Sequence, residues 1–276
     1  MCAGRACLSF EPVIDLHCHV LPGIDDGPST TEGSLALARA AAAAGTRTLV
    51  ATPHISWGYP NDADTIARLV REINTRLVAE AIALDVRPGA EIAITRVLDI
   101  EPAQLARLGL GGGPWLLIEP PFASVTTSLS EVVRDLKRHG HRIVLAHPER
   151  CQAFHDDPGM LDALVRDGAI TSITAGSLVG QFGESVRRFA LQLAHDELIH
   201  NVVSDAHDDV KRPPGVNAQL EHAGLGPLRE WLTEQVPAAI LAGEDTLPRR
   251  PAIVMRDPGA ARRSWWRRAS GLTRAS

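Results

Sequence analysis

Seven short apolar segments alternate with segments of helical length along most of this 276-residue chain. Segments this short and apolar are typical of strands buried on both faces, as in a parallel sheet covered by helices. The expected strands are residues 13–16, 46–51, 85–90, 115–118, 142–146, 169–173 and 201–204. Repeated strand–helix units imply right-handed crossovers and strands that run the same way. We therefore predict an α/β fold, and seven units without an internal break favour a barrel over an open sheet.

The segments between these strands carry helical signals. Apolar spacing predicts helices at 34–44, 62–83, 129–139, 159–166 and 183–195, with a shorter helix at 102–108. Ser29-Thr-Thr-Glu32 has the spacing of a capping box before the first helix. Gly45 ends that helix, and Gly140 and Gly168 mark the ends of two later helices. The glycine run at 111–113 is a loop, because no Lys-Ser/Thr pair follows it as a phosphate-binding loop requires.

Composition and charge narrow the range of functions. No run of about 18 apolar residues could cross a membrane, and the first seven residues lack the apolar core of a secretion signal. The four cysteines show neither Cys-x-x-Cys spacing nor a disulfide framework, which favours a reducing cytoplasm. The net charge is −5, yet the segment from Arg249 onward holds eight arginines and one aspartate. The remainder is therefore strongly acidic, which argues against a nucleic-acid partner.

We expect one domain over residues 12–248 and a basic tail over residues 249–276. The tail contains two adjacent Trp flanked by Arg pairs, Arg262-Arg-Ser-Trp-Trp-Arg-Arg268. One interpretation is a solvated, disordered end of the chain. The other is a contact with an anionic membrane surface or an acidic partner, because Trp flanked by Arg suits a lipid interface. The expected location of the protein is the cytoplasm. If the tail binds an anionic membrane, the protein would lie at the inner face of that membrane.

His17 and His19 form a His-x-His motif where the first expected strand turns polar. Residues i and i+2 of a strand point to the same side, so both imidazoles can reach one point while Cys18 points into packing. Two convergent neutral imidazoles are half of a divalent-metal site. One such motif is weak evidence alone, but further His and carboxylates recur at the ends of later strands.

These candidate ligands lie at the carboxyl ends of the strands, where barrel enzymes have their active sites. Each has a structural alternative, since turns, helix caps and exposed loops use the same residue types. In the Asp25-Asp26 pair, we expect one residue to serve a turn or cap and Asp26 to bind metal. The expected ligands are His17, His19, Asp26, His54, Glu91, Glu119, His147, Asp205 and His207. The other histidines are expected to be solvated or capping.

Five histidines and four carboxylates exceed the three or four protein ligands of one catalytic metal. They suit two or three divalent ions, with Glu91 as a bridge. Mixed N/O ligands without thiolate favour Mn²⁺, Fe or Zn²⁺ over Ca²⁺, with Mg²⁺ as a further alternative. Clustered metals activate water and neutralise the charge of a phosphoryl group. Arg150 and Arg212 could clamp phosphate oxygens, and ordinary surface arginines are the alternative. No cysteine begins a Cys-x5-Arg loop, which excludes a thiolate phosphatase of that kind.

Seven motifs match one family in order and spacing. They are Asp-Leu-His-Cys-His-Val-Leu-Pro-Gly-Ile-Asp-Asp-Gly, Thr-Pro-His, Gly-Ala-Glu-Ile, Ile-Glu, Ala-His-Pro-Glu-Arg, Ala-Gly-Ser-Leu-x-Gly-x-Phe-Gly and Ser-Asp-Ala-His. Over roughly residues 12–245 the chain resembles the polymerase-and-histidinol-phosphatase (PHP) superfamily. Within it, the chain is similar to the bacterial manganese-dependent protein-tyrosine phosphatases of capsule and exopolysaccharide loci, the CpsB/YwqE type.

The resemblance implies a distorted seven-stranded, TIM-like (β/α)7 PHP barrel with three metals. One metal would be held by His17, His19, Glu91 and Asp205, a second by Glu91, Glu119 and His147, and a third by Asp26, His54 and His207. The anion-binding arginines of the family would fall on Arg150 and Arg212. The implied substrate is phosphotyrosine on an autophosphorylating bacterial tyrosine kinase that controls polysaccharide export.

Three alternative functions remain open from the sequence. A small-molecule phosphatase, such as histidinol phosphatase, would use the same scaffold and metals. A regulatory binding module would hold metals only for structure and dock a kinase tail. A metallo-amidohydrolase is less compatible, because such barrels usually carry a metal-bridging Lys and no Lys stands at an expected strand end. The sequence is compatible with an oligomer and does not determine the oligomeric state.

Overall fold

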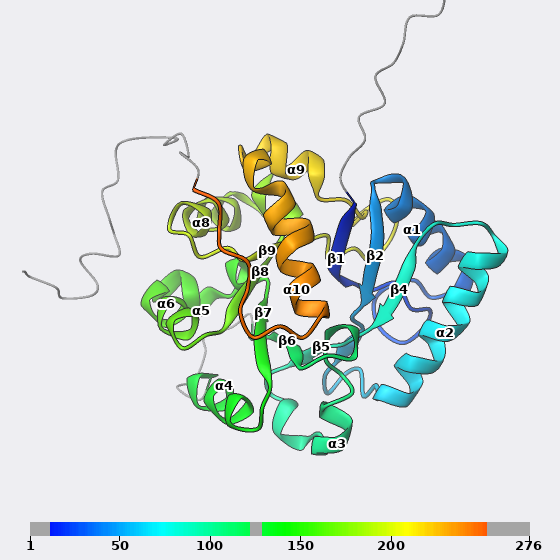
Figure 1. Ribbon diagram of the computed structural model, residues 1–276, viewed down its shortest axis with the longest axis horizontal. Coiled ribbons are helices and arrows are strands. Elements are labelled where there is room, and N and C mark those ends of the chain that lie inside the picture. Colours follow the sequence, from blue (N-terminus) through cyan, green and yellow to red (C-terminus); the bar gives the residue numbers. More distant parts are fainter. Residues whose placement is uncertain (1–11, 122–128, 253–276) are drawn as a thin grey trace, which may run out of the picture.

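The computed structural model describes residues 12–121 and 129–252. Within these residues, nine parallel strands form two sheets with helices packed around them (Figure 1). The first sheet has the order β1-β2-β4, and the second has the order β3-β5-β6-β7-β8-β9. The strands are β1 (Val13–Cys18), β2 (Thr46–Ala51), β3 (His54–Ile55), β4 (Asp85–Pro88), β5 (Glu91–Ala93), β6 (Trp115–Glu119), β7 (Arg142–Ala146), β8 (Ile170–Thr174) and β9 (Asn201–Val203). The predicted α/β class with a parallel sheet is confirmed.

Six of the seven expected strands coincide with observed strands to within two residues at either end. The segment expected at 85–90 instead holds only β4, and a further strand, β5, begins after Gly89 and Ala90. A Cβ atom at Gly89 would lie 2.7 Å from Val50 Cγ1, so the chain needs glycine where it passes from the first sheet to the second. The short strands β3 and β5 were not expected, because two or three residues are too few to show a periodic pattern.

All of the expected helices are present, and the short helices at 152–156, 175–178, 217–222 and 236–241 were not predicted. The helices are α1 (Thr31–Ala43), α2 (Ala63–Ala79), α3 (Pro102–Leu105), α4 (Leu129–Arg138), α5 (Gln152–Asp156), α6 (Pro158–Arg166), α7 (Ala175–Leu178), α8 (Glu184–His195), α9 (Asn217–His222) and α10 (Val236–Leu241), with short turns η1 (Val97–Asp99), η2 (Leu110–Gly112), η3 (Pro148–Arg150), η4 (Gly226–Leu228) and η5 (Trp231–Gln235). The cap of α1 is Thr30, whose side chain accepts from Gly33 N, one residue later than the expected capping box.

Burial follows the patterns that identified these elements. In β6, Leu116, Leu117 and Ile118 are all fully buried, as expected of a strand covered on both faces. In α4, the buried residues Leu129, Val132, Val133 and Leu136 form one apolar stripe at helical spacing. The remaining faces of the outer helices carry charged residues.

The helices cover the two sheets from outside. Figure 1 shows α1 and α2 beside β1, β2 and β4, and shows α4, α5, α6 and α8 beside the strands of the second sheet. α10 packs against β1 and η2, and Trp231 Nε1 in η5 donates to Pro248 O at 2.9 Å. Of the basic tail expected at 249–276, all but residues 249–252 lie outside the described residues. None of the helices in the described part of the chain combines the length and apolar character needed to cross a bilayer.

The two sheets meet at the carboxyl ends of β1 and β9. Cys18 and Ala206 form a parallel bridge. On either side of it, His19 N donates to Ala206 O at 2.9 Å and Asp205 N donates to His17 O at 3.0 Å. This seam brings the first ligand motif of the sequence against the last one.

Candidate metal centre

The nine expected ligands meet at the carboxyl edge of the strands. Among the described residues, their ligand atoms form overlapping groups in which all atoms lie within 4.8 Å of one another. These groups are His19, Asp26, His54 and His207; His17, His19 and Asp205; His17, Glu91 and His147; and His54, Glu91 and Glu119. Eight of the nine residues lie at or within four residues of the carboxyl end of a strand, so the parallel sheets account for their convergence, while Asp26 comes from the loop that follows β1.

His17 and His19 are fully buried and point at each other. Their Nε2 atoms are 3.2 Å apart. Two imidazoles bound to one ion at about 2.1 Å have nitrogens separated by about 3.0–3.4 Å, so the observed spacing fits a shared cation. Asp205 Oδ1 lies 3.5 Å from each Nε2. Glu91 Oε2 lies 3.3 Å from that of His17 and 3.5 Å from that of His19. These four residues are the first ligand set that the family resemblance implies.

Glu91 lies at the middle of the cluster. Its Oε1 is 2.6 Å from His147 Nε2, and its Oε2 is 2.9 Å from His54 Nδ1. Burial alone would raise the pKa of Glu91, but the neighbouring imidazoles of His17 and His147 hold it well below its usual range. Oε2 is buried and makes no hydrogen bond, although three imidazole nitrogens surround it. This geometry suits an oxygen that bridges two cations.

The other two implied sets are also brought together. Glu119 Oε1 lies 3.9 Å from His147 Nε2. Burial and the neighbouring Glu91 raise the pKa of Glu119 to about 7. On the open side of the cluster, Asp26 Oδ1 lies 3.5 Å from His54 Nε2 and 3.3 Å from His207 Nε2. The Asp26 side chain is 46 % exposed, which leaves this part of the centre accessible from solvent.

Asp25 has a role that the sequence did not reveal. As expected of one member of the pair, it serves a turn, accepting from Gly27 N at 3.0 Å. Its other oxygen contacts His19 Nδ1 at 2.7 Å and accepts from His54 N at 3.2 Å. A carboxylate on Nδ1 keeps the proton there and leaves Nε2 free to bind metal. The only signal for this role in the sequence was that Asp25 is adjacent to the expected ligand Asp26.

The backbone is strained at two of the candidate ligands. His147 and Asp205 have φ of 31° and 53°, in the left-handed region that favours glycine. Such conformations cost about 1–3 kcal/mol each and persist where the surroundings hold them. His147 N donates to Ser172 O at 2.8 Å, and Asp205 N is held in the seam to β1. Both strained residues aim their side chains into the cluster.

Arg150 and Arg212 lie beside the cluster and share one partner. Each places a guanidinium nitrogen 2.7 Å from Asp205 Oδ2, while Oδ1 of the same carboxylate faces the imidazoles. Phe182 lies under both arginines, with its ring centroid 4.6 Å and 5.9 Å from the two Cζ atoms. The sequence placed both arginines near the mouth of the site, but it gave no sign that Asp205 and Phe182 orient them.

The donor set fits divalent cations. The carboxylates and imidazoles of the cluster point their lone pairs at one another, and cations between them would offset the repulsion. Burial alone would lower the pKa of His19, but hydrogen bonds with Asp205 and Asp25 raise it well above its usual value. No thiolate of the described residues takes part, because Cys18 turns away toward Ala206 O and burial raises the pKa of its thiol. Nitrogen and oxygen ligands without sulfur suit Mn²⁺, Fe or Zn²⁺.

Residues 13–223 match the family described as capsular polysaccharide synthesis, CpsB/CapC. The chain belongs to the CpsB/CapC family. Tyrosine-protein phosphatase YwqE of Bacillus subtilis is 36 % identical to it over 252 residues, which cover 91 % of this chain and 97 % of YwqE. Tyrosine-protein phosphatase CpsB of Streptococcus pneumoniae is 29 % identical over 216 residues, covering 73 % of this chain and 86 % of CpsB. The resemblance inferred from the seven motifs is confirmed.

Solved structures agree with this family membership. A chain from the crystal structures of YwqE from Bacillus subtilis and CpsB from Streptococcus pneumoniae, described as unique metal-dependent tyrosine phosphatases, superposes with a TM-score of 0.74 and 34 % identity. The match covers 88 % of this CpsB/CapC member and all of that chain. Dihydropyrimidinase from Brevibacillus agri matches with a TM-score of 0.51 at 11 % identity, over 84 % of this chain and 70 % of that one, which shows a shared fold alone.

Proposed function

We propose that this CpsB/CapC member is a metal-dependent protein-tyrosine phosphatase. The observation that supports it most is the convergence of nine nitrogen and oxygen ligands beside two arginines. A cation cluster next to guanidinium groups suits a phosphoryl group, which carries negative charge on several oxygens. The activity named for YwqE and CpsB, at 36 % and 29 % identity, supports phosphotyrosine as the substrate.

The ligand sets implied by the resemblance are the assignment that we propose for three divalent ions, with Mn²⁺ as the metal. His17, His19, Glu91 and Asp205 would hold one ion; Glu91, Glu119 and His147 a second; and Asp26, His54 and His207 a third. Bound there, the ions would activate water and neutralise charge on the phosphoryl group. Glu91 is the shared ligand, in keeping with its contacts to His147 on one oxygen and to His54 on the other.

The side chains of this protein would bind and orient the phosphoryl group. Arg150 and Arg212 would bind its non-bridging oxygens, and their common contact with Asp205 keeps both guanidinium groups beside the ligands. No thiol of the described residues is suited to attack phosphorus. Cys18 and Cys151 are both buried, and burial raises the pKa of each thiol. The proposed reaction therefore needs no covalent phosphoenzyme.

The proposed macromolecular partner is an autophosphorylating bacterial tyrosine kinase that controls capsule or exopolysaccharide synthesis. The family's description as capsular polysaccharide synthesis supports this partner. A kinase of that kind presents its phosphotyrosine in the cytoplasm, so we also propose a cytoplasmic location, at or near the inner face of the membrane.

We further propose that the two sheets are one distorted seven-unit barrel. The bridge between Cys18 and Ala206 joins β1 to the segment after β9. Two residues separate β2 from β3, and two separate β4 from β5, so each pair counts as one interrupted strand. On that count seven strand units surround the core, which is the number expected from the sequence.

Turnover of a phosphotyrosine peptide and of histidinol phosphate by one metal-analysed sample tests this function. We expect the Mn²⁺-loaded protein to hydrolyse the peptide with the higher kcat/KM. A preference for histidinol phosphate would favour a small-molecule phosphatase, and no turnover at full metal occupancy would favour a binding module. His147→Ala should be inactive, whereas His139→Ala is the matched control, because His139 is an exposed residue just after α4.

A further inference from the structure

Exposed apolar side chains lie in segments at the same strand edge as the metal centre, and the proposed chemistry does not use them. Among the described residues, the large apolar side chains that are exposed are Trp57, Val78, Leu98, Val179 and Val210. All but Val78 lie in segments that follow the carboxyl end of a strand, namely β3, β5, β8 or β9. Val78 instead lies on the outer helix α2. Apolar side chains gathered at one edge indicate a contact surface, whereas singly scattered ones do not.

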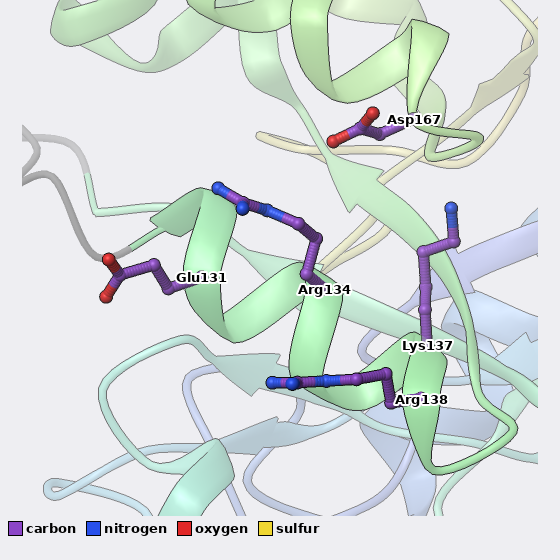
Figure 2. A pocket seen from close by; sticks show the side chains of 5 residues that line it. All are labelled: Glu131, Arg134, Lys137, Arg138 and Asp167. Carbon is purple, nitrogen blue, oxygen red and sulfur yellow. The ribbon is translucent and has the colours of Figure 1, made fainter.

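The outer face of the molecule offers a contrast. An open hollow there is lined by Glu131, Arg134, Lys137, Arg138 and Asp167 (Figure 2). All five side chains belong to exposed residues and carry charges of both signs. The hollow contains none of the nine candidate ligands and no apolar platform. The metal-bearing edge is therefore the surface that combines chemistry with exposed apolar groups.

Trp57 is held firmly although it is exposed. It lies in a turn closed by hydrogen bonds from Ser56 N to Tyr59 O at 3.0 Å and from Tyr59 N to Ser56 O at 3.2 Å. The guanidinium of Arg96 lies over the indole ring, with Cζ 4.2 Å from the ring centroid. Even so, the residue is 68 % exposed. The indole is thus a fixed platform with a large surface open to a partner.

Tyr59 connects this platform to the metal centre. Its ring is stacked on the imidazole of His54, with centroids 5.7 Å apart and planes 13° apart. Asn61 fixes the same segment, because its Nδ2 donates to His54 O at 2.9 Å and to Ile24 O at 2.8 Å. One anchored turn therefore carries a candidate metal ligand, His54, and the exposed ring of Trp57 three residues later.

We infer that Trp57, Tyr59 and Leu98 form a docking surface for the polypeptide that flanks the phosphorylated tyrosine, and that this surface selects apolar or aromatic neighbours of that tyrosine. The inference rests on the proposed phosphatase function and deepens it. Tyr59, beside His54, is placed to flank the aryl ring of the substrate. Trp57 and Leu98 lie further along the rim, where only a chain that continues beyond the ring could cover them. Arg96 holds the indole of Trp57 in place and is itself paired with Asp99, with 3.6 Å between Nη1 and Oδ2, so it fixes the platform rather than adding free charge to the rim.

Binding of a non-hydrolysable ligand tests this surface without depending on turnover. The probes are peptides with phosphonomethyl-phenylalanine flanked by Leu and Phe or by Gly and Ser, with benzylphosphonate as the small ligand. Titration calorimetry with Mn²⁺-loaded protein should show tighter binding of the apolar-flanked peptide. Trp57→Ala should weaken that binding about tenfold, and Leu98→Ala should weaken it less. Val78→Ala is the matched control and should match the wild type, as should benzylphosphonate binding by every variant.

Unchanged affinity of Trp57→Ala for the apolar-flanked peptide would overturn the docking surface. Equal affinity of the wild type for both peptides would do the same, as would an equal loss for benzylphosphonate, since that would mean damage to the metal centre. Hydrolysis of p-nitrophenyl phosphate, measured in parallel, reports on the chemistry alone, and Trp57→Ala should keep the wild-type rate. Failure of the wild type to hydrolyse it would reject the phosphatase function, while the binding data would still decide the docking surface.

Discussion

Two regions of this protein shield histidine from solvent, the first in part and the second completely, and they do so in opposite ways. His200, just before β9 at the amino ends of the strands, accepts a hydrogen bond from Thr171 N at 3.2 Å, and burial lowers its pKa to about 4. It is a neutral side chain satisfied by its own fold. At the carboxyl ends, His17 and His19 instead face each other across 3.2 Å beside the buried Glu91. Buried polar groups that lack mutual partners indicate a missing ligand, and satisfied ones indicate structure.

Removal of metal should separate the two regions most sharply. Chelation with EDTA should abolish turnover of a phosphotyrosine peptide, and Mn²⁺ should restore it, because the clustered carboxylates and imidazoles need cations to act. The melting temperature should also fall, since binding to the folded state alone stabilises it. Activity that survives thorough chelation would contradict the proposal that the carboxyl edge, unlike the surroundings of His200, needs metal.

Within the carboxyl edge, a ligand should matter more than an arginine. His147→Ala should lower kcat by about 10³-fold or more, because it removes a ligand that contacts Glu91. Arg212→Ala should lower kcat by about 10–10²-fold, because Arg150 still contacts Asp205. Steady-state kinetics at saturating Mn²⁺ measure both. Equal losses would contradict the proposed division of roles.

Asp25 tests whether a residue that touches no metal belongs to the metal region. Asp25→Asn should weaken metal affinity by about 10–100-fold, because the carboxylate that orients His19 through Nδ1 is lost. Asp62→Asn is the matched control, since Asp62 caps α2 and Asn caps a helix equally well. Titration of the metal-free proteins with Mn²⁺ measures the difference. Identical affinities for the two variants would make Asp25 a turn residue only.

His200 should affect stability against pH and leave turnover unchanged. Its folded pKa of about 4 lies below the unfolded value of 6.5, so the fold favours the neutral form. That stabilisation is complete above pH 6.5 and is lost as the pH falls toward 4. Between pH 7 and pH 5 the loss should be about 2 kcal/mol. Urea unfolding of the metal-free wild type and His200→Gln should show a smaller pH dependence in the variant. Parallel curves would mean that His200 is not responsible.

The α/β class and the convergence of the nine candidate residues could be predicted because they depend on periodicity and strand direction. Each apolar run gave a strand, and parallel strands bring their carboxyl ends together. Finer features depend on side-chain direction and tertiary contacts, which spacing does not encode. Asp205 shows this, because its two oxygens face His17 and Arg150 separately. The docking turn around Trp57 was missed because it has no periodic pattern. The helices α5, α7, α9 and α10 were missed because they are too short to show a helical repeat.

The seam between β1 and β9 governs when the centre can form during synthesis. Cys18 and Ala206 are 188 positions apart, and the intervening elements must be ordered before the two can meet. Contacts of such long range form late in folding, because closing a long loop costs chain entropy. When the His-x-His segment of a nascent chain has just left the ribosome, the later candidate ligands have not yet been synthesised, so the chain cannot yet form the complete metal site. Metal capture should mark the end of folding, and a polypeptide truncated before β9 should remain an apoprotein at any Mn²⁺ concentration that loads the full-length chain.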